Sequence, residues 1–206
     1  MLVNRRSGLL VVGGVVLALT SGGVAHAQRV SLSPQIGLYV PTKAMYDVAT
    51  TSDIYKLEAG LSFGARVGLW FGRRIGIDLS GNYVPTTFKL ESGGTSLSSQ
   101  KARLFTGAGQ VVLFLIPASS PLSLYVNGGV GVVSRGGVAF TSEAGTTDVS
   151  GVFGGGAALR LGPIGLHVGA DLFAYTAQYQ GTTAAAQQLR QLDVQLHLGL
   201  GVPFGG

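Results

Sequence analysis

Residues 192–204 read LDVQLHLGLGVPF, and this stretch decides the fold class. Its even positions are all apolar, whereas its odd positions include Asp193, Gln195 and His197. Successive side chains of a β-strand point to opposite faces, whereas a helix would mix the two sets. The stretch therefore predicts a two-faced strand with one wholly apolar surface.

The same two-residue alternation recurs along the chain. In residues 57–71, LEAGLSFGARVGLWF, eight apolar residues in succession share one face, beginning at Leu57. Shorter runs of the same kind cover 30–40, 75–83, 122–132 and 164–172. Two weaker strands fit the gaps at about 101–116 and 149–161, and the pattern leaves the parity of 101–116 undetermined. The sequence thus predicts eight strands.

Short and long connections alternate between these strands. Short turns are expected at 72–74, 117–121 and 162–163, and longer polar loops at 41–53, 91–100, 136–147 and 180–186. An up-and-down barrel has this alternation when one rim faces the periplasm and the other faces outside. Both chain ends are then expected on the short-turn side.

Composition separates a membrane barrel from a soluble one. Of 206 residues, 46% are hydrophobic and only 11% are charged, and 34 are Gly. A water-exposed barrel needs more charge than this on its polar face. Small polar residues suit a narrow lumen, and the apolar face suits lipid. We therefore predict an all-β fold, an eight-stranded antiparallel up-and-down transmembrane β-barrel.

The amino-terminal residues form an export signal by pattern. Arg5 and Arg6 precede an apolar run at 8–19, and Ala25-His26-Ala27 matches the A-x-A cleavage pattern. The run is too short for a membrane-spanning helix. We predict a secretory signal peptide at 1–27, cleaved after Ala27, a barrel domain at 28–206, and a location in the bacterial outer membrane. The scattered basic residues predict no nucleic-acid partner.

From these strands, the chain resembles the eight-stranded outer-membrane β-barrel proteins of the OmpA-, OmpX- and OmpW-like group over residues 29–204. The most specific piece is 197–204, HLGLGVPF, which looks like the aromatic-ended last strand of this group. The resemblance implies that Phe204 acts as an assembly signal. It also implies outer-membrane lipid, lipopolysaccharide, the barrel-assembly machinery and periplasmic chaperones as partners.

Charged and imidazole side chains occupy the face predicted to point inward. They are Glu58, Arg66, Asp78, Arg160, His167, Asp171, Asp193 and His197. Charges in a confined lumen need partners, so we expect a structural polar network that includes an Asp171–His197 pair. Serines at 62, 80 or 123 could join either His in a hydrolase-like set, but we expect no nucleophile motif such as G-x-S-x-G, and these residues also face inward. We predict no catalytic residue, cofactor or metal site.

Three functions fit this pattern. The first is a structural or surface-interaction barrel whose lumen is mostly filled by side chains, because eight strands enclose little more than side-chain volume. The second is a narrow channel for small solutes, as in the OmpW-like branch. The third is an outer-membrane lipid-modifying enzyme.

Overall fold

The computed structural model describes residues 28–42, 46–48, 53–92, 95–137, 147–179 and 187–204. The predicted signal peptide, 1–27, lies outside the described residues. The strands within these ranges are β1 (Gln28–Pro41), β2 (Tyr46–Val48), β3 (Asp53–Leu57), β4 (Gly60–Phe71), β5 (Ile75–Ser92), β6 (Thr95–Phe114), β7 (Leu122–Gly137), β8 (Thr147–Leu161), β9 (Ile164–Tyr179) and β10 (Gln187–Phe204).

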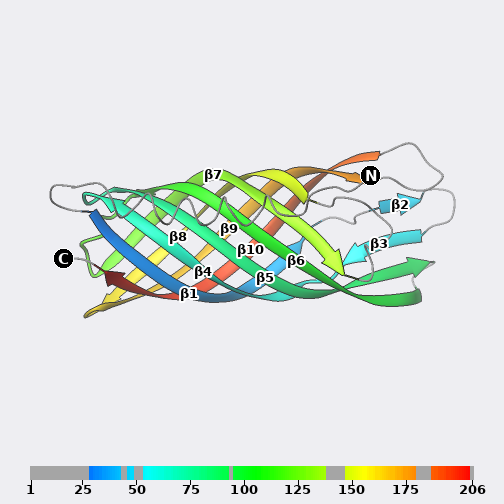
Figure 1. The fold of residues 1–206 in the computed structure, drawn as a ribbon, viewed down its shortest axis with the longest axis horizontal. Coiled ribbons are helices and arrows are strands. Elements are labelled where there is room, and N and C mark those ends of the chain that lie inside the picture. The colour runs from blue at the N-terminus through cyan, green and yellow to red at the C-terminus, as the bar shows by residue number, and fades with distance from the viewer. Residues whose placement is uncertain are drawn as a thin grey trace, which may run out of the picture.

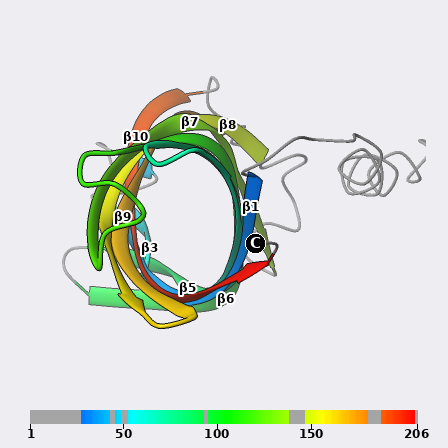
Figure 2. The ribbon, with the colours of Figure 1, turned by 90° about the vertical axis from the view of Figure 1, so that its left-hand side faces the viewer.

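Eight of these strands close into a barrel, seen from one end in Figure 2. The ring runs β1-β4-β5-β6-β7-β8-β9-β10, and β10 pairs back onto β1 with Val30 opposite Phe204. Every pairing in the ring is antiparallel. The predicted closed up-and-down topology is confirmed. Closure leaves no free sheet edge, so the backbone groups of every barrel strand have a neighbour on both sides.

The two ends of the barrel differ, as the loop lengths predict. Short connections join β4 to β5, β6 to β7 and β8 to β9 at the left-hand end of Figure 1. Gly72 and Gly162 have φ of 74° and 64°, which glycine adopts without the Cβ penalty of other residues. The first residue of β1 pairs with the last of β4, so β1 starts and β10 ends at the short-turn end. The opposite end carries the connections from β1 to β4, from β7 to β8 and from β9 to β10, together with the short β5–β6 connection, and is called the long-loop end below.

Alternation along each strand separates an apolar outside from a mixed inside. Large apolar side chains such as Leu61, Val168 and Leu196 are exposed by 62%, 54% and 45%. Their neighbours Ser62 and Gln195 are buried. This pattern gives the barrel the outer apolar band of a transmembrane barrel. Among the described residues no helix is long and apolar enough to cross a membrane.

Strand β6 is apolar on both faces, which explains why its parity could not be predicted. Its even positions, including Leu104 and Val112, are buried in the lumen, whereas its odd positions, including Phe105 and Val111, are exposed. A period-two pattern carries no information about direction when both sets are apolar. The pairing of β6 with β5 and β7 fixes which of its faces points into the lumen.

The predicted face assignment fails at the start of the 57–71 run. Gly60–Phe71 pairs with β5 in one register, and Asp53–Leu57 pairs with β5 in a register shifted by one residue. One extra residue at Glu58–Ala59 forms a bulge, where the Glu58 amide donates to the Thr87 carbonyl over 2.9 Å. A one-residue shift reverses the faces, so Leu57 is buried instead of lipid-facing.

The predicted loop at 91–100 is also wrong. β5 extends to Ser92 and β6 begins at Thr95, so the two strands continue as a paired ribbon beyond the apolar band. In the predicted loop at 41–53, β2 and β3 pair with each other, and β3 pairs with β5. Polar composition alone does not separate a loop from a strand that extends into water.

Candidate functional site

The lumen holds an ion-pair network centred on Arg66 of β4. Its Nη1 lies 3.2 Å from Asp78 Oδ2, and its Nη2 lies 2.8 Å from Asp171 Oδ2. All three side chains are at most 6% exposed. Buried charges are tolerated when they are paired and hydrogen-bonded, so this cluster joins β4, β5 and β9 across the interior.

Asp171 collects more donors than any neighbouring carboxylate in this network. Its Oδ1 accepts hydrogen bonds from Asn127 Nδ2 at 2.6 Å and Gln110 Nε2 at 3.1 Å, in addition to the Arg66 contact. His197 Nδ1 lies 3.5 Å from Asp171 Oδ2. One guanidinium faces two carboxylates here, and the amide donors of Asn127 and Gln110 solvate the excess negative charge.

Two imidazoles lie beside this network. Asp171 is opposite Gln195 in the β9–β10 register, so it meets His197 diagonally and not directly across. On its other side, His197 Nε2 lies 3.5 Å from the Tyr125 hydroxyl. The ring centroids of His167 and His197 are 5.8 Å apart. The structure thus brings Arg66, Asp78, Asp171, His197 and His167 into one region of the lumen.

Uncharged polar groups form a chain next to the ion pairs. Gln35 Nε2 donates to Asn82 Oδ1 over 2.6 Å, and Asn82 Nδ2 donates to Thr106 Oγ1 over 3.4 Å. The Thr106 hydroxyl donates to Gln195 Oε1 over 3.0 Å. This chain links β1, β5, β6 and β10, and its members are all buried.

Asp193 belongs to a second polar cluster. Its Oδ2 accepts hydrogen bonds from the hydroxyls of Tyr39 and Tyr175, each at 2.5 Å. The Arg135 guanidinium carbon lies 5.0 Å from the centre of the Tyr175 ring, and Arg135 Nη1 lies 2.6 Å from Asp148 Oδ2. Asp193 is therefore anchored by tyrosines in a place separate from the Arg66 network.

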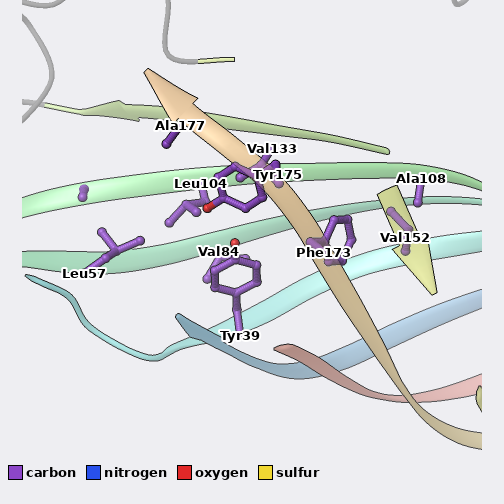
Figure 3. Packing of buried hydrophobic residues seen from close by; sticks show 11 residues of the cluster. Tyr39, Leu57, Val84, Leu104, Ala108, Val133, Val152, Phe173, Tyr175 and Ala177 are labelled. Atoms are coloured by element: carbon purple, nitrogen blue, oxygen red, sulfur yellow. The ribbon is translucent and has the colours of Figure 1, made fainter. Parts of the chain in front are cut away.

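Apolar side chains fill the lumen around these tyrosines. Figure 3 shows Tyr39, Val84, Leu104 and Phe173 projecting toward one another from different strands. Each is at most 1% exposed. At the short-turn end, a smaller aromatic cluster contains Phe114, whose ring centroid is 5.1 Å from that of Trp70 and 5.9 Å from that of Tyr125.

Two residues predicted for the lumen network lie outside it. Glu58 is turned out by the bulge and pairs with Lys89 at 2.5 Å, with both side chains more than a third exposed. Arg160 has the inward parity but stands one residue before the end of β8, where it is exposed and donates to the Ala118 carbonyl over 2.9 Å. Phe204 ends β10, and its side chain lies outside the described residues.

Several lumen residues were missed although a usable signal was present. Extending the predicted parity of 122–132 and 164–172 toward the long-loop end places Arg135 and Tyr175 inside, where the structure has them. Gln35, Asn82 and Gln195 stood on predicted inward faces but carry no charge. Thr106 and Gln110 lie on β6, whose parity the sequence leaves open. Only contacts between strands identify these last two.

Ser62 lies at the centre of GLSFG (60–64), which matches the G-x-S-x-G pattern of hydrolase nucleophiles. The expectation that the sequence contains no such motif is therefore wrong. In hydrolases the pattern forms a sharp strand-to-helix turn that exposes the serine. Here Ser62 is mid-strand in β4 and 2% exposed. Among the described residues no group of three or more His, Asp or Glu side chains is arranged to hold a metal ion.

The closed ring of eight antiparallel strands, with an apolar outer band and a polar interior, defines a small barrel of the outer-membrane type. Solved structures of this class have the same fold. The outer membrane protein OprG from Pseudomonas aeruginosa matches with a TM-score of 0.64 at 10% identity, over 87% of this chain and 97% of OprG.

Two further structures of the class are similar. Neisserial surface protein A matches with a TM-score of 0.57 at 10% identity, over 87% of this chain and all of that protein. The E. coli outer membrane protein W matches at 0.50 and 15% identity, over 88% of this chain and all of that protein. At these identities the likeness is one of fold. No family model and no curated protein sequence matches the chain.

Proposed function

We propose that this protein is a resident of the bacterial outer membrane with a structural or surface-interaction role and a lumen closed by its own side chains. The observation that carries the proposal is the filling of the lumen at successive levels. Tyr39, Leu104 and Phe173 lie toward the long-loop end, the Arg66 network lies below them, and Trp70 and Phe114 lie at the short-turn end. An eight-stranded barrel has little interior volume beyond that of its side chains.

Export and assembly belong to the same proposal. The signal peptide of 1–27 is cleaved after Ala27, periplasmic chaperones carry the chain, and the barrel-assembly machinery recognises the strand that ends at Phe204. The polar network of Arg66, Asp78, Asp171 and His197 then has a structural role, since it ties strands together that are distant in sequence. The outer-membrane neighbours of this fold support the proposed location.

A narrow channel is the second candidate. Several buried lumen atoms accept or donate no hydrogen bond within the described residues, among them Arg66 Nε, Asp78 Oδ1, Gln110 Oε1 and His167 Nε2. Buried polar atoms of this kind usually bind water. Water pockets that joined into one path would let small solutes pass. The buried, inward position of His197 and Asp171 gives no comparable support to a lipid-modifying enzyme.

Conductance in planar bilayers separates the two candidates. Purified, refolded protein is expected to insert without stable conductance steps. The double variant Leu104→Gly with Phe173→Ala removes two of the filling side chains and is expected to raise conductance. The pair Leu196→Ala with Leu198→Ala changes only the outer band and serves as the control. Reproducible conductance of the unaltered protein would replace the closed-lumen proposal with the channel. Incubation of the refolded protein with outer-membrane lipid is expected to leave the lipid composition unchanged. A changed composition would support the enzyme alternative.

A further inference from the structure

A shallow groove lies on the outer surface of β6, β7 and β8. Its volume is about 260 Å³, and its lining is apolar. The lining residues are Gly107, Ala108, Gly109, Val130, Gly131, Val132 and Val149. Ala108 and Gly131 contribute from the inward positions of their strands, and the others point outward.

The groove exists because glycines interrupt the outer apolar band. Gly107 is opposite Val132, and Gly109 is opposite Val130, in the β6–β7 register. At corresponding outward positions β1 and β10 carry Ile36, Leu196 and Leu198. Exposed aliphatic side chains therefore border a floor of backbone, and a flexible hydrocarbon chain can lie against it with more contact than on the rest of the band.

The character of the surface changes directly toward the long-loop end. Ser134 of β7 and Thr147 of β8 are paired in the register, and the Thr147 hydroxyl donates to Ser134 Oγ over 2.9 Å. Ser134 lies one outward position beyond Val132 on β7, and Thr147 lies one outward position before Val149 on β8, so both hydroxyls are on the long-loop side of the groove. A pair of hydroxyls therefore borders the apolar groove on the side where the membrane surface is expected.

Two basic side chains lie beyond the hydroxyls. Lys101 and Arg103 occupy consecutive outward positions of β6 and are exposed. A Cβ built on Gly136 of β7 would lie 3.3 Å from Arg103 Nε, so the Arg103 side chain leans across β7 toward the column above the groove. Neither residue takes part in an ion pair within the described part of the chain.

We propose that this surface is a binding site for a phosphorylated lipid of the outer leaflet, the lipid A portion of lipopolysaccharide. An acyl chain lies in the groove, Ser134 and Thr147 meet the polar linkage region, and Arg103 with Lys101 binds a phosphate. Arginine pairs with phosphate through two parallel hydrogen bonds, and the Lys101 ammonium adds a second charge. This inference rests on the proposed membrane location and assigns one lipid to a defined surface of the barrel.

Charge complementarity selects this occupant over an uncharged lipid. The described outward surface next to the groove offers two cations and no carboxylate in contact with them. The order along β6 is basic pair, Phe105, then Gly107 and Gly109, which matches an amphiphile that carries its phosphate outermost. A strand rises about 3.3 Å per residue, so Arg103 lies about 13 Å along β6 from Gly107 in the groove.

Native mass spectrometry of the full barrel titrated with diphosphorylated lipid A tests the site, with fully dephosphorylated lipid A as the second probe. Arg103→Gln and Lys101→Gln are each expected to weaken binding about fivefold. Arg190→Gln is the matched control, since Arg190 is exposed two residues beyond the apolar Leu192 on β10. It is expected to leave the affinity unchanged.

Filling the groove tests the acyl-chain part. In Gly107→Leu the new Cβ would lie 3.4 Å from Val132 Cγ2. This variant is expected to weaken the binding of both lipid A probes. Gly128→Leu is the control, because a Cβ there meets only the Val152 carbonyl at 3.8 Å and Gly128 does not line the groove.

Equal affinity for the two probes, or equal losses in Arg103→Gln and Arg190→Gln, would overturn the lipid site. Insertion of the same samples into phosphatidylcholine vesicles, followed by circular dichroism and protease protection, reports on membrane residence separately. A barrel that inserts but shows no selective lipid A binding contradicts the site alone. A barrel that fails to insert contradicts the proposed location as well.

Discussion

The lumen near the long loops and the lumen around Arg66 are filled by opposite chemistry. Near the long loops, Val84, Leu104 and Phe173 meet as apolar side chains. Around Arg66, two carboxylates, a guanidinium and several amides hold each other through hydrogen bonds. The stability of the apolar region depends on how completely its side chains fill the space. The stability of the polar region depends on every hydrogen-bond and ion-pair partner being present. The two regions should therefore respond differently to substitution.

The largest effect is expected from Asp171→Ala. Loss of this carboxylate leaves Arg66 with Asp78 as its remaining ion-pair partner and removes the acceptor of Asn127 and Gln110. The Arg66, Asn127 and Gln110 donors then lose an acceptor. Each buried donor left unsatisfied costs roughly 1 to 3 kcal/mol, so the free energy of unfolding is expected to fall by roughly 3 kcal/mol or more. Urea unfolding of the refolded barrel in lipid vesicles measures the free energy of unfolding.

Replacing the whole ion cluster sharpens this comparison. The triple variant Arg66→Met, Asp78→Leu, Asp171→Leu removes every charge of the cluster at once. Apolar replacement of a complete buried ion cluster is often neutral or stabilising. The triple variant is therefore expected to be more stable than Asp171→Ala. A triple variant as unstable as the single one would show that the amide contacts, and not the charges, hold this region.

Leu196→Arg compares the outer band with the lumen. Leu196 is 45% exposed on the lipid side of β10, between the buried Gln195 and His197. An arginine near the bilayer midplane is expected to cost roughly 2 to 4 kcal/mol. Unfolding in vesicles gives the cost, and a spin label at the same position should report acyl chains. A label that reports water would reverse the face assignment of β10.

Phe173→Leu probes the apolar region with a conservative change. Phe173 is 1% exposed among Leu104, Val84 and Val152. Leucine keeps the site apolar and removes only part of the side-chain volume, so the change is expected to cost roughly 1 kcal/mol, comparable to losing about one buried methylene. The same unfolding measurement should therefore show a smaller loss than Asp171→Ala. A loss as large as that of Asp171→Ala would remove the proposed distinction between a region that depends on volume and one that depends on partners.

The smallest effect is expected at the rim. Lys89→Gln breaks the contact with Glu58, but both side chains are more than a third exposed, so water replaces the lost partner. Exposed ion pairs contribute between about 0 and 1 kcal/mol. The free energy of unfolding should change by less than about 1 kcal/mol and depend weakly on salt. A change comparable to that of Asp171→Ala would place this pair among the structural contacts of the barrel.

Much of the fold follows from local patterns. The eight barrel strands, the short connections and the outward faces of β1, β5, β7, β9 and β10 were predicted, because a strand that separates lipid from a polar interior must alternate at every step. The inward positions of Arg66, Asp78, Asp171 and His197 follow from the same alternation. For these residues, parity alone is sufficient.

What parity leaves open depends on contacts between strands. Glu58 has the inward parity of its run, but the bulge before β4 turns it outward, and Arg160 keeps its parity but lies too close to a turn to enter the lumen. Neither a bulge nor the depth of a residue along the barrel axis appears in a two-residue period.

The amino-acid sequence by itself determined that this chain alternates, how many strands the barrel has and which faces are uniformly apolar, because those properties depend on neighbours one and two residues away. The tertiary structure alone decided the parity of β6, the contacts of Asp171 with Arg66, Asn127 and Gln110, the partners of Asp193, and the groove beside Arg103. Each of these depends on residues brought together by register and closure of the ring. A local period is blind to register, since many alignments of the same strands satisfy it equally well.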